Sequence, residues 1–316
     1  MTAASDIRST EQLDVPVIDY EGSQYKSEFW EGQGREYEDT VERLAIRRLL
    51  PCHGGRVAEI GAGFGRLADL YQGYEQIILF DYSRTLLQDA VGRWGNDPRF
   101  IFVSGNIYQL PLATGSLDSL MMVRVMHHLA EVPQALQQIE RVLHKRSVAV
   151  LEYANKRNLK AIVRWLLNRQ HWSPFDLAPL EFVALNFDFH PQWMKKQIGE
   201  ASLVIRQQLA VSHFRLPLLK ERIDAQRLAA FEALLFYWGG IFPLAPSVFV
   251  QTVSQSQRTP KAVASTQDAV ADLFCCPHCR AEAFQLIDEV RLLCGQCGAT
   301  FGKQQGIWDF KESLAA

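Results

Sequence analysis

A glycine-rich turn at residues 59–65, EIGAGFG, restricts the possible folds more than any other part of the chain. It directly follows the apolar run RVAEI, and glycines at positions 61, 63 and 65 allow a tight turn that a ligand can approach without meeting a Cβ. The spacing differs from the G-x-G-x-x-G pattern that holds a pyrophosphate at a helix N-terminus. The turn therefore favours a ligand without phosphate groups.

Strand-like and helix-like runs alternate around this turn. Strands are expected at residues 56–60, 76–81, 99–104, 117–125 and 147–153, and helices at 65–71, 83–94 and 133–143. Such alternation is typical of a parallel sheet covered by helices on both faces. With two later strand-like runs, at 203–214 and 247–254, we expect an α/β fold: a Rossmann-like, doubly wound, mostly parallel seven-stranded sheet.

An acidic residue ends the second expected strand. Asp81 stands twenty residues after Gly61, where a carboxylate can accept hydrogen bonds from both hydroxyls of a ribose. Strand, glycine turn, helix, strand and terminal acid occur in the order that a nucleotide site in such a sheet requires. The sequence therefore predicts a nucleoside-binding site where the first two strands end.

Residues 57–153 resemble the core of the class I methyltransferases, of the type 11 kind, whose methyl donor is S-adenosylmethionine. The matching pieces are AEIGAGFG, the acid of LFDYS, SGNIYQLPLATGSLDSL and VMHHLAEVPQALQQIERVL. The resemblance implies that the glycine turn lies beside the methionine part and the ribose, and that the acid binds the ribose. The cofactor-binding residues that follow are Glu59, Gly61, Ala62, Gly63, Gly65, Asp81, Tyr82, Asn106, Ile107 and Arg124.

The sequence departs from that family at Asn106, where an Asp near the adenine amino group is common. An Asn carbonyl can still accept that hydrogen bond, although without charge. The methyl donor supplies the electrophile, so the protein mainly has to align the acceptor and, where needed, remove a proton. His128, after the fourth expected strand, and Glu152, at the end of the fifth, are the candidates for catalysis, and the alternative for both is a packing role.

The chain divides into four parts. We expect an N-terminal arm and helix at residues 1–50, a methyltransferase domain at 51–254, a polar linker at 255–272 and a zinc ribbon at 273–316. Two insertions, at about 154–200 and 215–245, are expected to form a helical cap over the carboxyl ends of the strands. The apolar run 228–250 contains an acid, two glycines and two prolines, so no stable membrane span is expected.

The cap combines tryptophans with an excess of basic residues. Residues 154–260 carry 13 basic and 7 acidic side chains, whereas the whole chain has a net charge of −2. Such a surface can receive an anionic small molecule, a lipid headgroup or a single-stranded nucleic acid. Alternatively, the tryptophans belong to a core and the cations form a solvated face.

Two C-x2-C pairs near the C-terminus predict a structural zinc site. Cys276, Cys279, Cys294 and Cys297 can place four thiolates around a tetrahedral Zn²⁺, with Cys52 and Cys275 uninvolved. Residues 274–310 also resemble small zinc-ribbon activators that bind and stabilise methyltransferases acting on tRNA, rRNA and release factors. This resemblance implies stabilisation in cis, with recruitment of a protein partner as the alternative.

These features together predict an S-adenosylmethionine-dependent methyltransferase with a small-molecule or lipid-like acceptor. The absence of an overall basic charge disfavours tight RNA binding. An enzyme that modifies RNA or a protein of translation remains an alternative, as does a non-catalytic cofactor-binding scaffold. Because the N-terminus MTAASDIRSTEQLD lacks a basic start and an apolar run, a cytoplasmic location is expected.

Overall fold

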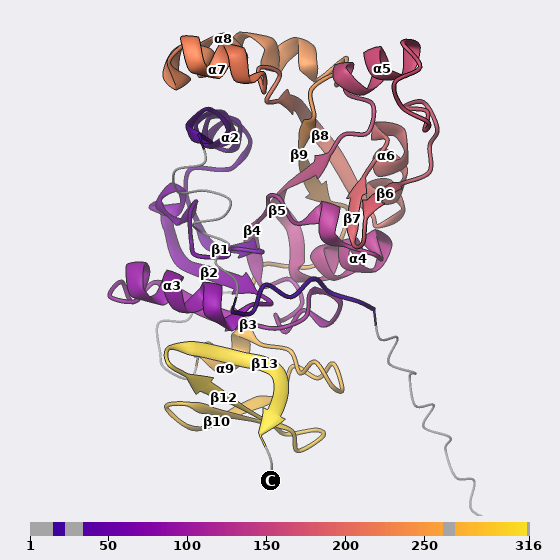
Figure 1. Ribbon diagram of the computed structural model, residues 1–316. Helices are drawn as coiled ribbons and strands as arrows, with labels where there is room; N and C mark the ends of the chain where they lie inside the picture. Colours follow the sequence, from indigo (N-terminus) through magenta and orange to yellow (C-terminus); the bar gives the residue numbers. More distant parts are fainter. Residues whose placement is uncertain (1–14, 23–33, 262–268, 315–316) are drawn as a thin grey trace, which may run out of the picture.

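Figure 1 shows the computed structural model of the protein, which describes residues 15–22, 34–261 and 269–314. Within these residues, one eleven-stranded sheet has the order β10-β11-β12-β13-β3-β2-β1-β4-β5-β9-β8. Its strands are β1 (Gly54–Ile60), β2 (Tyr74–Asp81), β3 (Phe100–Ser104), β4 (Leu117–Met122), β5 (Leu143–Ala154), β8 (Leu203–Val211), β9 (Ser247–Ser254), β10 (Phe284–Asp288), β11 (Arg291–Cys294), β12 (Thr300–Gln304) and β13 (Ile307–Leu314). A separate hairpin consists of β6 (Leu180–Val183) and β7 (Asn186–Asp188).

Seven adjacent strands, in the order β3-β2-β1-β4-β5-β9-β8, confirm the predicted Rossmann-like sheet. β1 pairs in parallel with β2 and β4, while β9 is antiparallel to both β5 and β8. Residues 57–60 and 77–80 are buried, as expected for strands covered on both faces. Ile60 lies opposite Phe80, so the glycine turn after β1 and Asp81 at the end of β2 meet at one edge of the sheet.

Helices cover the two faces of this sheet and enclose two apolar cores. The helices are α2 (Glu36–Leu49), α3 (Arg84–Trp94), α4 (Val132–Val142), α5 (Leu159–Leu166), α6 (Pro191–Glu200), α7 (Pro217–Arg222), α8 (Ala225–Gly239) and α9 (Ala269–Leu273). One core includes residues of α2, α3 and α8, and the other includes residues of α4 and α6. Among the described residues, no helix is both long and apolar enough to cross a membrane.

The prediction of a helix at residues 65–71 is wrong. Only a single 3-10 turn, η1 (Ala68–Tyr71), forms there. Gly65 has a left-handed backbone, with φ of +70°, and β2 begins at Tyr74, so the intervening chain has room for one tight turn only. The predicted strands at 117–125 and 203–214 and the predicted helix at 133–143 are present with slightly different ends.

The two expected cap insertions leave the sheet from its carboxyl edge. α5, the β6–β7 hairpin and α6 follow the end of β5, and α7 and α8 follow the end of β8. Because Ala154 and Val211 both lie opposite Ser247, the two exits are adjacent. In Figure 1, helices α5, α7 and α8 form the end of the molecule farthest from the C-terminal strands.

The C-terminal strands extend the main sheet, which sequence reasoning did not predict. β13 pairs in parallel with β3, with Ile307 opposite Phe102 and Asp309 opposite Ser104. Residues 262–268 of the expected linker lie outside the described residues. Earlier in the linker, Arg258 makes an ion pair with Glu140 at 2.8 Å. The C-terminal unit is thus joined to the edge of the seven-stranded sheet by backbone hydrogen bonds.

Candidate functional site

A cavity lies at the carboxyl ends of β1, β2 and β4. Its walls come from the glycine turn, the end of β2 and the segment after β4, and from residues near the N-terminus. The lining residues are Val17, Ile18, Tyr20, Ile60, Gly61, Gly63, Phe80, Asp81, Tyr82, Leu86, Gly105, Ile107, Arg124, Val125, His128 and Leu129. Six of the residues predicted to bind cofactor are among them, together with His128. The cavity thus collects side chains from distant parts of the sequence at the edge where ligands bind in open α/β sheets.

The three glycines of the turn have different roles. At Gly61, with φ of +72°, an added Cβ would lie 2.1 Å from a methyl group of Val125, so only glycine fits. At Gly63, with φ of +52°, the nearest atom to an added Cβ is 3.9 Å away, which leaves this stretch of backbone open to a ligand. Gly65 does not line the cavity and instead packs against Trp94.

Asp81 is held against the glycine turn by backbone donors. Its carboxylate accepts hydrogen bonds from the amides of Gly63 at 2.7 Å and Ser83 at 2.9 Å. Burial raises the pKa of Asp81 above its usual value. A carboxylate has about four acceptor positions, so Asp81 can still accept a hydrogen bond from a ligand hydroxyl group.

Glu59 lies behind the turn in a small second cavity. This cavity is lined by Glu59, Gly61, Ala62, Gly63, Phe64, Arg66, Leu67, Val123 and Arg124. The Glu59 side chain is buried and accepts a hydrogen bond from the Tyr71 hydroxyl at 2.9 Å. Burial raises its pKa to about 8, so the carboxyl group is protonated over much of the neutral range.

Two further residues expected to bind the cofactor line the main cavity, but Asn106, expected near the adenine, does not. Tyr82 and Ile107 are part of its wall. The side-chain oxygen Oδ1 of Asn106 accepts a hydrogen bond from the Tyr108 amide at 2.9 Å. It thereby caps a short 3-10 turn, η2 (Ile107–Gln109). This oxygen is therefore already engaged in a local turn.

His128 lies on the cavity wall in a defined tautomer. Its Nδ1 is 3.4 Å from the Leu185 carbonyl oxygen, which can only accept, so Nδ1 carries the proton. Nε2 is then the acceptor for the Tyr20 hydroxyl at 3.3 Å. Burial lowers the pKa of His128, so the ring is neutral at pH 7. A neutral imidazole can accept a proton at Nε2 from a bound molecule that takes the place of the Tyr20 hydroxyl.

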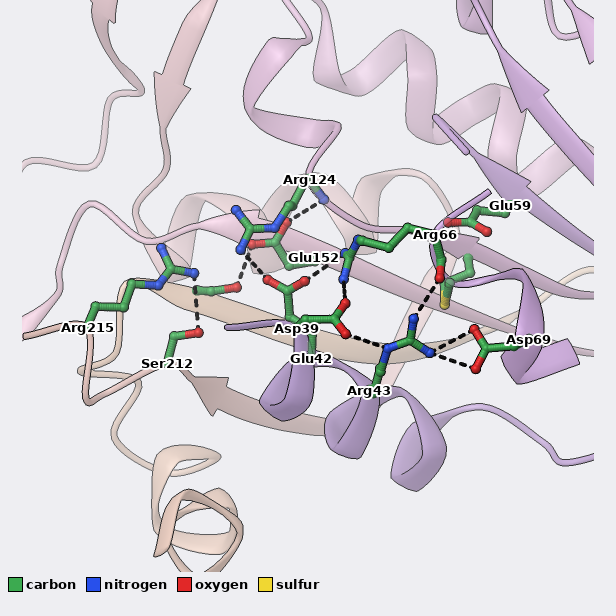
Figure 2. A network of polar contacts seen from close by, with 12 residues as sticks. Asp39, Glu42, Arg43, Glu59, Arg66, Asp69, Arg124, Glu152, Ser212 and Arg215 are labelled. Atoms are coloured by element: carbon green, nitrogen blue, oxygen red, sulfur yellow. Dashed lines mark hydrogen bonds and ion pairs between the residues drawn. The ribbon is translucent and has the colours of Figure 1, made fainter. Parts of the chain in front are cut away.

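Glu152 lines neither cavity and belongs to a polar network, shown in Figure 2. It is buried and accepts hydrogen bonds from the Arg124 amide at 2.8 Å and from the Ser247 hydroxyl. Arg124 has an unusual left-handed backbone, with φ of +59°. Glu152 thus holds Arg124 in a conformation that non-glycine residues rarely adopt.

Helix α2 adds a second acid to this network. Glu42 is buried between Arg124 and Arg66, with ion pairs to both. Burial alone would raise the pKa of Glu42, but the two guanidinium groups lower it to about 2. Arg66 also pairs with Asp39, so α2 is tied to the glycine turn and to the segment after β4. Sequence reasoning missed Glu42 because helical spacing alone does not show which face of α2 meets these arginines.

Sequence reasoning also missed the N-terminal segment at residues 15–22. Val17, Ile18 and Tyr20 line the cavity. Glu21 fixes the segment because its carboxylate accepts from the amides of Arg84, at 2.8 Å, and Thr85, at 3.0 Å. The apolar and aromatic residues in VPVIDY were the available signal for a buried segment.

The four predicted metal ligands come together in the C-terminal unit. The sulfur atoms of Cys276, Cys279, Cys294 and Cys297 all lie within 4.8 Å of one another. The sulfur atoms of Cys276 and Cys297 are 3.7 Å apart, and those of Cys279 and Cys294 are 3.5 Å apart. Tetrahedral Zn–S bonds of about 2.3 Å require a separation of about 3.8 Å, so this geometry fits zinc. Cys275 points elsewhere, with its sulfur 3.3 Å from the Arg280 carbonyl oxygen.

Comparisons with known proteins found similar methyltransferases. Residues 58–151 match the family described as a methyltransferase domain. A probable S-adenosylmethionine-dependent methyltransferase of Mycolicibacterium smegmatis is 31% identical over 123 residues, which are 39% of this chain and 45% of the relative. A similarly described protein of Mycobacterium tuberculosis is 27% identical over 46% of this chain and 48% of its own length. The chain thus spans about half the length of these curated relatives.

Solved structures show the same fold. An S-adenosylmethionine-dependent methyltransferase from Mesorhizobium loti has a TM-score of 0.52 at 16% identity, over 69% of this chain and 99% of its own. A chain from a complex that contains the Haloferax volcanii Trm112 methyltransferase activator has a TM-score of 0.51 at 16% identity, over 74% of this chain and 98% of its own. Residues 58–151 of this chain thus match the methyltransferase domain model, and similar proteins include probable S-adenosylmethionine-dependent methyltransferases.

Proposed function

We propose that this protein transfers a methyl group from S-adenosylmethionine to a small-molecule or lipid-like acceptor. One observation carries the proposal: the open backbone at Gly63 and the carboxylate of Asp81 meet in a cavity at the carboxyl ends of β1 and β2. A carboxylate at the end of the second strand suits the hydroxyls of a ribose. Gly63 leaves room for the backbone to contact a ligand directly.

The chain's residues would bind, orient and shield the reactants. S-adenosylmethionine supplies the electrophilic methyl group when bound. We propose Glu59, Gly61, Ala62, Gly63, Asp81, Tyr82, Ile107 and Arg124 as the residues that hold it, with Gly65 shaping the turn and Asn106 capping the next one. His128 is the proposed proton acceptor, because its unprotonated nitrogen lies at the cavity wall. Glu152 supports the site through Arg124.

The nature of the cavity supports an acceptor that is at least partly apolar. Val17, Ile18, Ile107, Val125 and Leu129 all contribute to its walls. Incubation of the purified protein with methyl-labelled cofactor and, separately, metabolite, lipid, RNA and protein extracts would test this. Label in a lipid or metabolite fraction is the expected result. Cofactor binding without label in any fraction would indicate a non-catalytic scaffold instead.

An acceptor among RNAs or translation proteins is the second candidate. It is favoured by the C-terminal unit, whose attachment to β3 suits a module that stabilises a methyltransferase in cis. We propose that the four clustered cysteines hold a structural zinc ion there. Because this unit is small, the metal would supply much of its folding free energy. Label in the RNA or protein fraction of the same experiment would support this candidate.

A further inference from the structure

The cap carries most of the exposed apolar surface of the described residues. The described residues include 18 exposed large apolar side chains, and 16 of these lie between residues 159 and 242. They are Leu159, Val163, Trp165, Leu166, Leu167, Phe175, Leu177, Phe182, Val183, Leu216, Leu218, Phe231, Leu234, Trp238, Ile241 and Phe242. Such a concentration marks a surface that meets an apolar partner. We call these residues, with the elements that carry them, the cap surface.

Helices α5 and α8 present these side chains as stripes. Leu159, Val163 and Leu166 are spaced by four and three residues and therefore share one face of α5. On α8, Phe231 and Leu234 lie on one face, and Leu234 is 71% exposed. α5 and the end of α8 are neighbours, because the Leu159 amide donates to the Leu244 carbonyl at 2.8 Å. Figure 1 places both helices at the same end of the molecule.

Cations lie among these apolar side chains. Lys160 and Arg164 are exposed on α5, next to its apolar stripe, and Arg169 is exposed just after it. On α8, exposed Arg227 is one turn before Phe231 and on the same face. Interfaces between protein chains are depleted in lysine and in charge at their core. Apolar side chains interleaved with lysine and arginine are instead the composition of helices that lie in a membrane interface.

From this distribution we infer that the cap surface docks on an anionic lipid bilayer. The apolar side chains of α5, α8 and the β6–β7 hairpin enter the interface, and Lys160, Arg164 and Arg227 contact lipid phosphates. The hairpin joins this surface to the cavity, since Leu185 at its turn contacts His128. An amphiphilic acceptor could thus pass from the bilayer to the site. This last consequence rests on the proposed function, whereas the docking itself does not.

Vesicle flotation of the full zinc-loaded chain tests the inference. The wild type should bind vesicles of about three parts phosphatidylcholine to one part phosphatidylglycerol about tenfold more tightly than vesicles of phosphatidylcholine alone. Binding should weaken as salt rises through a few tenths molar, because screening shortens the reach of surface charge. Lys160→Gln with Arg164→Gln should abolish most of the preference for the anionic vesicles.

A matched pair of double variants tests the apolar part. Phe231→Ser with Leu234→Ser should lower binding at least tenfold. Ile287→Ser with Val290→Ser, which removes two exposed apolar side chains from the opposite end of the molecule, should leave it unchanged. Equal binding of the two double variants, or no binding by the wild type, would overturn the inference. Dimers that dissociate only in the Phe231/Leu234 variant would assign the surface to a second copy instead.

Calorimetry with S-adenosylmethionine on the same variants separates the two proposals. The cap surface lies outside the cofactor cavity, so all these variants should bind cofactor like the wild type. Vesicle binding without cofactor binding would refute the proposed function and leave the docking surface intact. Cofactor binding without vesicle binding would refute the docking surface and leave the proposed function intact.

Discussion

Asp309 allows a quantitative test of how the C-terminal unit is attached. This strand residue of β13 accepts a hydrogen bond from the Ser104 hydroxyl of β3 at 2.7 Å and pairs with Arg84 at 2.5 Å. Both Asp309 and Ser104 are buried. Asp309→Ala leaves the Ser104 hydroxyl without this acceptor, which costs about 1–3 kcal/mol. The Arg84 side chain is 39% exposed, so the ion pair adds only about 0.5 kcal/mol.

We therefore expect Asp309→Ala to lower the free energy of unfolding by about 1.5–3.5 kcal/mol. Urea denaturation of the zinc-loaded protein, followed by circular dichroism, measures this. Zinc content should remain unchanged, because Asp309 is not one of the residues close enough together to share a metal ion. Asp309→Asn retains an oxygen for Ser104 and should lose clearly less stability than the alanine variant.

The control is Asp288→Ala in the same C-terminal unit. Asp288 is exposed and pairs with Arg291 three residues away. This substitution should not shift the denaturation midpoint measurably, because exposed local ion pairs contribute little. If Asp309→Ala behaved like Asp288→Ala, the seam between β13 and β3 would not stabilise the methyltransferase domain, and the argument for stabilisation in cis would lose its basis.

Three further predictions concern the candidate sites. Asp81→Ala should weaken S-adenosylmethionine binding by about 1–3 kcal/mol in calorimetry, and unchanged affinity would refute its assignment. Elemental analysis should find about one zinc per chain, lost in Cys276→Ser and retained in Cys275→Ser; the reverse pattern would show that the ligand register is wrong. Glu59→Gln should flatten the pH dependence of stability: burial raises the Glu59 pKa from 4.5 to about 8, so the folded state keeps a proton that the unfolded state releases. Wild-type stability relative to this variant should therefore fall between about pH 4.5 and 8, by at most about 5 kcal/mol, and parallel pH profiles would contradict the shift.

The centre of the fold could be predicted because its signals are local. The strand before Gly61, the turn itself and Asp81 are close in sequence, and residue spacing determines that they meet at one sheet edge. The cysteine cluster is equally local, since two C-x2-C pairs can satisfy one ion. The adenine contact of Asn106 stays a prediction from the resemblance, and the structure adds that its side chain caps a turn, which asparagine often does.

The parts that could not be predicted depend on contacts between distant segments. Glu42 meets Arg124 across 82 residues, and the Tyr20 hydroxyl meets His128 across 108. A charge on a helix or a tyrosine near a terminus has many possible partners, and periodicity does not choose among them. The pairing of β13 with β3 is of the same kind, because any exposed sheet edge offers unpaired backbone groups to a short strand.

This pairing also brings the C-terminal unit to the cofactor cavity. The ammonium group of Lys311, on β13, lies 3.9 Å from the centre of the Tyr82 ring, which lines the cavity. The same ammonium group is 3.9 Å from Asp19, in the N-terminal segment that forms part of the cavity wall. A cation over an aromatic face contributes about 0.5–1 kcal/mol at an exposed site. Lys311 thus links β13 of the C-terminal unit with the wall of the proposed cofactor site. Unfolding of this unit would remove a contact from Tyr82 as well as the strand that pairs with β3.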